Sequence, residues 1–84
     1  MPYPPYFHDD TGAVRFWILI NGLWIGASVS RDTLHYRYRR DAVDDLPMDT
    51  YTAHAAELED AVRARVARGS IEPVMLREHD LRPQ

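Results

Sequence analysis

An Asn-Gly pair at residues 21 and 22 separates two largely apolar stretches, and it constrains the fold more than any other feature of the sequence. Asn-Gly adopts the two positive φ angles of a type I′ turn, which joins antiparallel strands through two residues. We therefore predict a β-hairpin over residues 13–29, with Ile20 opposite Leu23. The same rule pairs Leu19 with Trp24, Ile18 with Ile25, Trp17 with Gly26 and Phe16 with Ala27.

The two faces of this hairpin differ in character, because successive side chains of a strand point to opposite sides. One face is apolar throughout and is the predicted core face: Val14, Phe16, Ile18, Ile20, Leu23, Ile25 and Ala27. The other face mixes polar side chains with large apolar ones: Arg15, Trp17, Leu19, Trp24 and Ser28.

Two helices are predicted after the hairpin. Ser30 is expected to cap the first, which runs to about Tyr38 or Arg39. The second begins near Pro47, a residue suited to a first helical turn, and stops at Gly69. Its apolar residues recur every three or four positions, as in a helix with one buried face: Met48, Tyr51, Ala55, Leu58, Val62 and Val66.

The predicted fold class is α+β, a small antiparallel sheet in the order β-β-α-α-β with two helices packed on one face. The last strand is expected over residues 71–77, at an edge because Pro73 cannot donate a hydrogen bond. We expect a Pro/Tyr-rich arm and turn over residues 1–12, a single domain over residues 13–77 and a flexible tail over residues 78–84. Within the arm, Tyr6-Phe7 is a candidate for a short segment that folds back beside the first hairpin strand.

Composition excludes several classes of protein. A chain of 84 residues forms one domain. The absence of cysteine excludes disulfides and cysteine-based metal or redox chemistry. The longest apolar run, Phe16–Ile20, is too short for a membrane span or a signal peptide, so we expect a cytoplasmic protein with no membrane association. The net charge of −3 gives no general attraction to nucleic acid or to an anionic membrane. All ten basic residues are arginine, which we attribute to a GC-rich genome.

The surface formed by Trp17, Leu19 and Trp24 is the first candidate functional site. Two helices cover only the other face of the sheet, so something else must shield these side chains. The arm of residues 2–7, a protein partner or a small molecule are the alternatives. Because tryptophan is a favoured anchor at interfaces, we predict a non-enzymatic protein-interaction module, in its simplest form a homodimer, with no small-molecule substrate.

A segment that interleaves aromatic and basic residues is the second candidate, and it suggests nucleic-acid or phosphate binding as the alternative function. It consists of Tyr36, Arg37, Tyr38, Arg39 and Arg40. The aspartates at 41, 44 and 45 follow directly and offset its charge, as on many solvated helix ends.

Catalysis, cofactors and metals find no support in the sequence. The four histidines, at 8, 35, 54 and 79, lack the spacing of a metal site, and no serine lies in a nucleophile elbow. An enzyme would need a pocket that brings His54 and Glu57 together with a residue such as His35. We expect no catalytic residue, no cofactor and no metal.

The chain also resembles a family of small bacterial proteins known as domain of unknown function 1488. The shared features are the Val14-Arg15-Phe16 strand, the Asn21-Gly22 turn and the start of a helix at residues 29–34. They also include Tyr51, His54 and Ala61 in the long helix and the closing Asp80-Leu81. The resemblance implies a compact α+β domain and carries no functional assignment. The sequence departs from it in the Pro-Tyr arm and in the arginine-rich residues 36–40.

Overall fold

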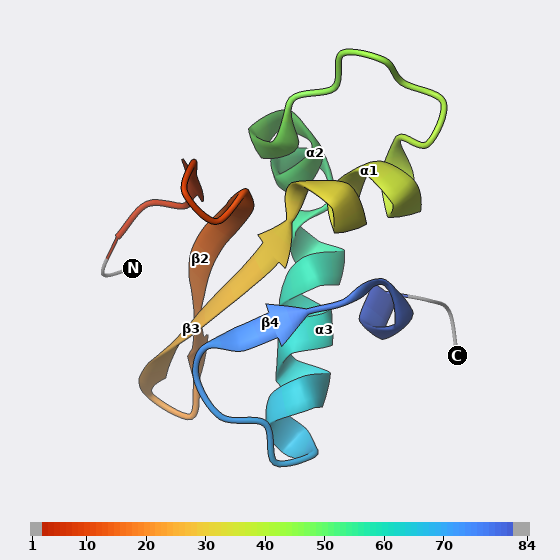
Figure 1. Cartoon of the computed structure of the whole chain (residues 1–84). Helices are drawn as coiled ribbons and strands as arrows, with labels where there is room; N and C mark the ends of the chain where they lie inside the picture. The colour runs from red at the N-terminus through yellow and green to blue at the C-terminus, as the bar shows by residue number, and fades with distance from the viewer. Residues whose placement is uncertain (1–2, 82–84) are drawn as a thin grey trace.

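A computed structural model describes residues 3–81, which form an α+β domain as predicted (Figure 1). A four-stranded sheet lies in front of the helices in this view, and the longest helix passes behind the last strand. The elements in chain order are β1 (Tyr6–His8), β2 (Ala13–Ile20), β3 (Leu23–Ser30), α1 (Arg31–Tyr38), α2 (Pro47–Ala53), α3 (Ala55–Ala67), β4 (Val74–Leu76) and the short 3₁₀ helix η1 (Glu78–Leu81).

The β2–β3 hairpin confirms the predicted turn and register. Asn21 and Gly22 have φ angles of 50° and 80°, and every predicted pair from Ile20–Leu23 to Phe16–Ala27 is formed. The N-terminal arm folds back as β1, which pairs antiparallel with β2 so that Tyr6 lies opposite Arg15. The sheet therefore begins before residue 13, the predicted start of the domain.

The sheet is mixed, which corrects the predicted antiparallel sheet. Its strand order is β1-β2-β3-β4, and β4 pairs with β3 in the parallel direction. The chain leaves the end of β3 through all three α-helices before it returns to the sheet. Such a crossover brings the chain back to the end where β3 begins, so the next strand runs parallel to it. The strand itself is limited to Val74–Leu76, shorter than the predicted 71–77, because it begins after Pro73.

The core lies between the sheet and the helices. Phe16 is completely buried and its ring is 5.1 Å from that of Tyr51 on α2, while Leu58 on α3 is also fully buried. The prediction that Leu23 belongs to the core is wrong, because 65% of this residue is exposed. Leu23 adjoins the turn, where the end of the hairpin projects away from α3 (Figure 1). Ile20 and Ile25 are partly buried at the margin of the core.

The predicted second helix is two helices, which corrects the expected number of helices from two to three. His54 interrupts it with φ −123° and ψ 20°, and its backbone N–H donates to the carbonyls of both Thr50 and Tyr51. Two interactions accompany this break. The Thr52 hydroxyl donates to the Met48 carbonyl at 2.8 Å, a contact that bends helices. The His54 ring also stacks on Tyr38 of α1, with the ring centroids 3.8 Å apart.

Residues 78–81 are folded, which corrects the prediction that the flexible tail starts at residue 78. They form η1, Leu81 is buried in the core, and its carbonyl accepts a hydrogen bond from Arg37 Nε at 2.9 Å. The rest of the predicted tail, residues 82–84, and the first two residues of the arm lie outside the described part of the chain.

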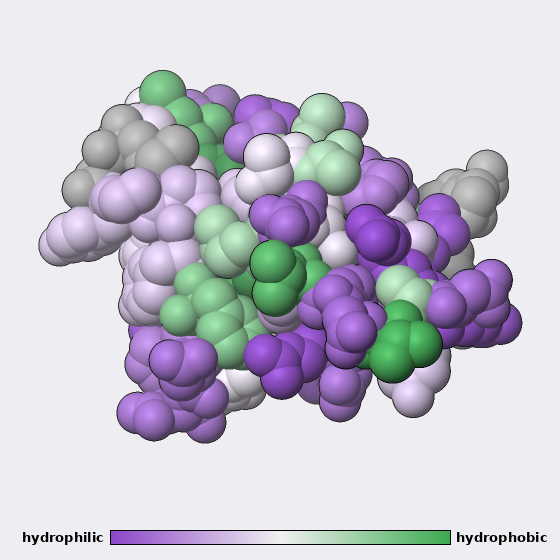
Figure 2. All heavy atoms as spheres, turned by 90° about the horizontal axis from the view of Figure 1, so that it is seen from above, coloured by the Kyte–Doolittle hydropathy of each residue, from purple (hydrophilic) through white to green (hydrophobic). Residues whose placement is uncertain are grey.

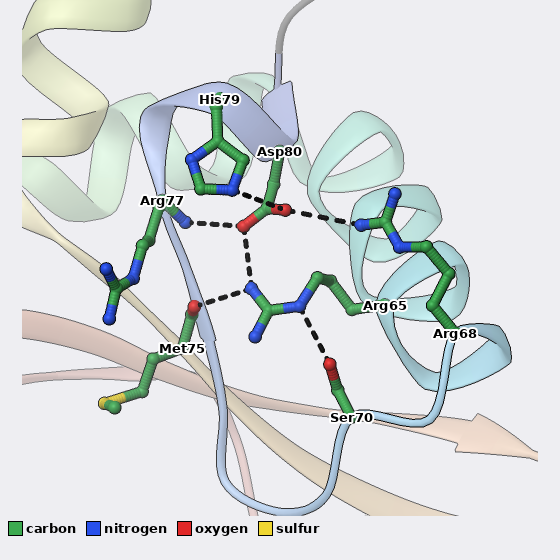
Figure 3. Close-up of polar contacts among 7 residues, drawn as sticks. All are labelled: Arg65, Arg68, Ser70, Met75, Arg77, His79 and Asp80. Atoms are coloured by element: carbon green, nitrogen blue, oxygen red, sulfur yellow. Dashed lines mark hydrogen bonds and ion pairs between the residues drawn. The ribbon is translucent and has the colours of Figure 1, made fainter.

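Asp80 anchors this C-terminal turn (Figure 3). Only 1% of its side chain is exposed, and its Oδ2 accepts hydrogen bonds from Arg65 Nη1 at 2.8 Å and from the Arg77 backbone N–H at 2.9 Å. Its Oδ1 lies 3.5 Å from Arg68 Nη2 and 3.6 Å from His79 Nε2. The carboxylate therefore joins η1 to α3.

Arg65 extends the same connection to β4. Its Nη1 also donates to the Met75 carbonyl at 3.1 Å, and its Nε donates to Ser70 Oγ at 2.9 Å (Figure 3). The Met75 carbonyl, which belongs to the edge strand β4, thus has a hydrogen-bond partner on α3. Natural sheets often shield edge strands in this way, because an unpaired edge invites pairing with other chains.

Candidate functional site: the outer face of the sheet

The face of the sheet that points away from α3, here called the outer face, carries the first candidate site. Its side chains alternate along the strands with those of the core. Its members are Tyr6 on β1, Arg15, Trp17 and Leu19 on β2, Trp24, Gly26 and Ser28 on β3, and Met75 on β4.

The N-terminal arm covers only part of this face. The Trp17 ring is half-buried, 5.2 Å from the ring of Tyr3 and 6.2 Å from the stacked ring of Tyr6. Leu19 and Trp24, which pair across the hairpin, are still 50% and 40% exposed. The structure thus divides the predicted site: the arm shields one tryptophan and leaves the other two side chains open.

Gly26 allows Trp17 and Glu72 to approach the sheet closely. Its N–H donates to Glu72 Oε2 at 2.9 Å. A Cβ atom at this position would lie 3.3 Å from both Trp17 Nε1 and Glu72 Oε2, closer than ordinary van der Waals contact. The Trp17 ring and the Glu72 carboxylate therefore occupy the space that a larger residue would need.

We expect Gly26→Val to displace Trp17 and to lower the free energy of unfolding by about 1–3 kcal/mol, the usual cost of forcing atoms into filled space. Urea unfolding and tryptophan fluorescence measure the two effects. Ser28→Val is the control, because it places the same side chain one position further along the same face of β3. Equal stability losses in both variants would contradict the role of Gly26.

A hollow of about 580 Å³ lies on the outer face beside Trp17. Small residues of β3, Gly26 and Ser28, contribute to its lining, and Trp17 and Met75 add apolar surface. The charged groups that line it are Arg15, Glu72 and Arg77. Sequence reasoning missed Glu72, Met75 and Arg77 as site residues. The sequence predicts a strand over residues 71–77, but it carries no signal that this strand pairs with β3.

The two arginines that line the hollow and the glutamate beside them differ in whether their charged groups have a partner within residues 3–81. Glu72 is held by the Gly26 N–H, whereas neither the Arg15 nor the Arg77 guanidinium has a hydrogen bond or an ion pair within residues 3–81. Figure 3 shows the Arg77 side chain directed away from Asp80, which binds only the backbone N–H of this residue. The hollow therefore carries two arginines that are paired neither with Glu72 nor with any other residue of 3–81, beside apolar surface.

The basic segment of residues 36–40 contains two side chains with intramolecular contacts and three that are exposed. Arg37 holds the Leu81 carbonyl, lies 3.6 Å from Glu57 and has its guanidinium 5.5 Å from the centre of the Tyr38 ring. Tyr38 is half-buried under His54, and burial together with the Glu57 carboxylate raises the pKa of its hydroxyl. These two side chains serve intramolecular packing.

The other three members of the segment, Tyr36, Arg39 and Arg40, are exposed. Tyr36 and Arg40 line a second hollow of about 380 Å³, but Asp32 and Glu78 line it as well. Acidic side chains oppose the binding of a phosphate group. The structure therefore does not gather the five residues into one basic surface.

The residues that an enzyme would need each make contacts with other side chains. His35 Nδ1 lies 3.2 Å from both carboxylate oxygens of Asp45, while His54 stacks on Tyr38 and Glu57 faces Arg37. Across residues 3–81, no group of three or more histidine, aspartate or glutamate side chains is placed to hold a metal ion. None of the helices in this range has the length and apolarity that crossing a membrane requires.

Comparison with known proteins adds no relative. No protein-family model, no curated protein and no solved structure matches this chain. The fold and the site define a small α+β domain with a mixed four-stranded sheet, helices on one face and an open second face. The resemblance to domain of unknown function 1488 stays a prediction.

Proposed function

We propose that this domain is a non-enzymatic protein-interaction module that associates with a second copy of itself through the outer face of the sheet. One observation supports this most strongly. The inner side chains of the hairpin are almost fully buried from Val14 to Ile18, whereas Leu19 and Trp24 on the outer face remain about half exposed. Exposed tryptophan beside aliphatic surface is typical of interface anchors.

The size of the domain is compatible with a stable interface. It measures 38 × 30 × 20 Å along its principal axes, so a broad face can supply the roughly 800 Å² per partner that stable complexes bury. A lack of cysteine suits a reducing compartment, and we place this association in the cytoplasm.

Sedimentation velocity over a range of concentrations tests the proposal. We expect the wild-type protein to change from monomer to dimer or larger species as its concentration rises through the micromolar range. Trp24→Ser and Leu19→Ser should each weaken association at least tenfold, because both remove apolar contact area from the centre of the interface.

Leu23→Ser is the matched control, since Leu23 belongs to the same hairpin and is exposed but points to the opposite side of the sheet. It should associate like the wild type. A wild-type protein that stays monomeric at every concentration would overturn the proposal, and so would equal association by all three variants. Circular dichroism confirms that each variant is folded.

A further inference from the structure

We infer that the hollow on the outer face binds the loop between α1 and α2 of a second copy, so that two different surfaces meet in the contact. This inference rests on the proposed function and names the element that the second copy contributes. It depends on the complementary charge and apolar character of the hollow and of the acidic part of this loop, which spans residues 39–46.

The hollow presents two cations, Arg15 and Arg77, whose guanidiniums have no hydrogen-bond or ion-pair partner among residues 3–81, and one carboxylate, Glu72, which accepts from the Gly26 N–H. Arg15 projects from β2 and Arg77 follows β4, so their guanidiniums approach the hollow from two different strands. Trp17 and the exposed Met75 supply apolar surface in the same hollow. A matching ligand would therefore carry at least two carboxylates and an apolar side chain.

The α1–α2 loop projects from the body of the domain (Figure 1), and after the exposed Arg39 and Arg40 at its start it has this composition. Asp41 and Asp44 are exposed, and neither forms an ion pair with another described residue. Val43 between them is 91% exposed. Seen from above, the end of the molecule where this loop projects carries small apolar patches separated by hydrophilic side chains (Figure 2).

The third aspartate of the loop holds it in place. Asp45 is largely buried against His35 of α1, with both carboxylate oxygens 3.2 Å from His35 Nδ1. The adjacent Ala42 N–H donates to the Arg39 carbonyl at 2.9 Å. A loop tied down in this way loses less conformational entropy on binding than a mobile one.

A second copy, and not the same molecule, must supply the loop. None of the loop residues lines the hollow within one molecule. Both copies also carry a net charge of −3, so they repel each other unless a local basic surface meets a local acidic one. A contact between unlike surfaces is heterologous, and it builds a ring or an open chain of copies.

Charge reversal on each side provides the test. The first variant combines Arg15→Glu with Arg77→Glu, and the second combines Asp41→Arg with Asp44→Arg. Each alone sets like charges against each other and should weaken self-association at least tenfold in sedimentation velocity. An equimolar mixture of the two variants should associate with an affinity within threefold of the wild type, because the hollow of each variant then meets an oppositely charged loop of the other.

Arg63→Glu and Asp60→Arg, made separately on the exposed side of α3, each change the net charge by half as much as the corresponding double variant and should leave association unchanged. If the variant with Arg15→Glu and Arg77→Glu unfolds, a variant with Arg15→Gln and Arg77→Gln takes its place. We expect this variant to weaken self-association by a smaller but measurable factor.

The outcomes separate this inference from the proposed function. If both charge-reversal variants associate like the wild type while Trp24→Ser does not, the loop is not the occupant and the interface on the outer face stands. The same conclusion follows if the mixture fails to recover association. If the wild type never associates, both proposals are overturned.

Discussion

Phe16→Ala should remove a large part of the stability of this domain. Phe16 is completely buried at the centre of the sheet and packs on Tyr51 of α2. Truncating a buried phenylalanine costs about 3–5 kcal/mol, because transfer free energy is lost and a cavity is left behind. A domain of 84 residues has roughly 4–13 kcal/mol in total. Urea unfolding followed by circular dichroism measures the loss.

Leu23→Ala is the control for this prediction. Leu23 belongs to the same hairpin and, by alternation, to the same side of the sheet, but it is mostly exposed at the turn. We expect a change of about 0.5 kcal/mol or less, as for most surface substitutions. A similar loss in both variants would show that Phe16 is not the centre of the core.

Asp80→Asn should cause the second largest loss, about 2–3 kcal/mol in the free energy of unfolding. The change keeps the shape of the side chain and its contact with the Arg77 N–H, but it removes the charge that neutralises Arg65 and Arg68. Removing one partner of a buried ion pair costs up to about 3–5 kcal/mol. We expect a loss at or somewhat below the lower end of this range, because Arg65 and Arg68 are themselves partly exposed to water.

The contribution of Asp80 should also depend on pH. Burial by itself raises the pKa of this carboxyl, but the Arg77 N–H and the Arg65 guanidinium outweigh it, so the pKa lies below its ordinary value. A carboxyl with a lowered pKa in the folded state stabilises the protein above its unfolded pKa of about 4. That contribution is lost as the pH falls through the lower folded pKa.

Unfolding measured between neutral and acidic pH therefore gives a second test. The stability difference between the wild type and Asp80→Asn should be largest at neutral pH and should shrink below about pH 4. Asp60→Asn is the control, because the Asp60–Arg63 pair is exposed and should contribute little at any pH. A difference that stays constant with pH would contradict the role of the Asp80 charge.

The elements whose causes are local follow from short stretches of the sequence. Asn21 and Gly22 adopt the positive φ angles that their turn requires, and this fixes the register of the whole hairpin. Ser30 Oγ accepts the Thr33 N–H at 3.0 Å and starts α1. Gly69, with φ 97°, ends α3. In each case a few neighbouring residues supply the hydrogen bonds or the backbone angles that decide the structure.

The basic segment of residues 36–40 shows the limit of this reasoning. Its pattern suggested one surface, but Arg37 and Tyr38 are held by Glu57 and His54, which lie far along the chain. Likewise, the period of apolar residues continues without change across His54, although the helix is interrupted there. Neither outcome follows from spacing alone, because the contacts of Arg37, Tyr38 and His54 involve residues of another helix.

Tertiary structure alone decided the direction of β4 and, with it, the candidate site. Parallel pairing places Met75 beside Ser28 and brings Glu72 and Arg77 to the hollow next to Trp17. Tertiary structure also decided that residues 78–81 are folded, because Asp80 forms an ion pair with Arg65 on α3. Turns and caps are fixed by contacts within a few residues of the chain, whereas strand direction, buried ion pairs and hollows depend on segments that meet only when the chain has folded.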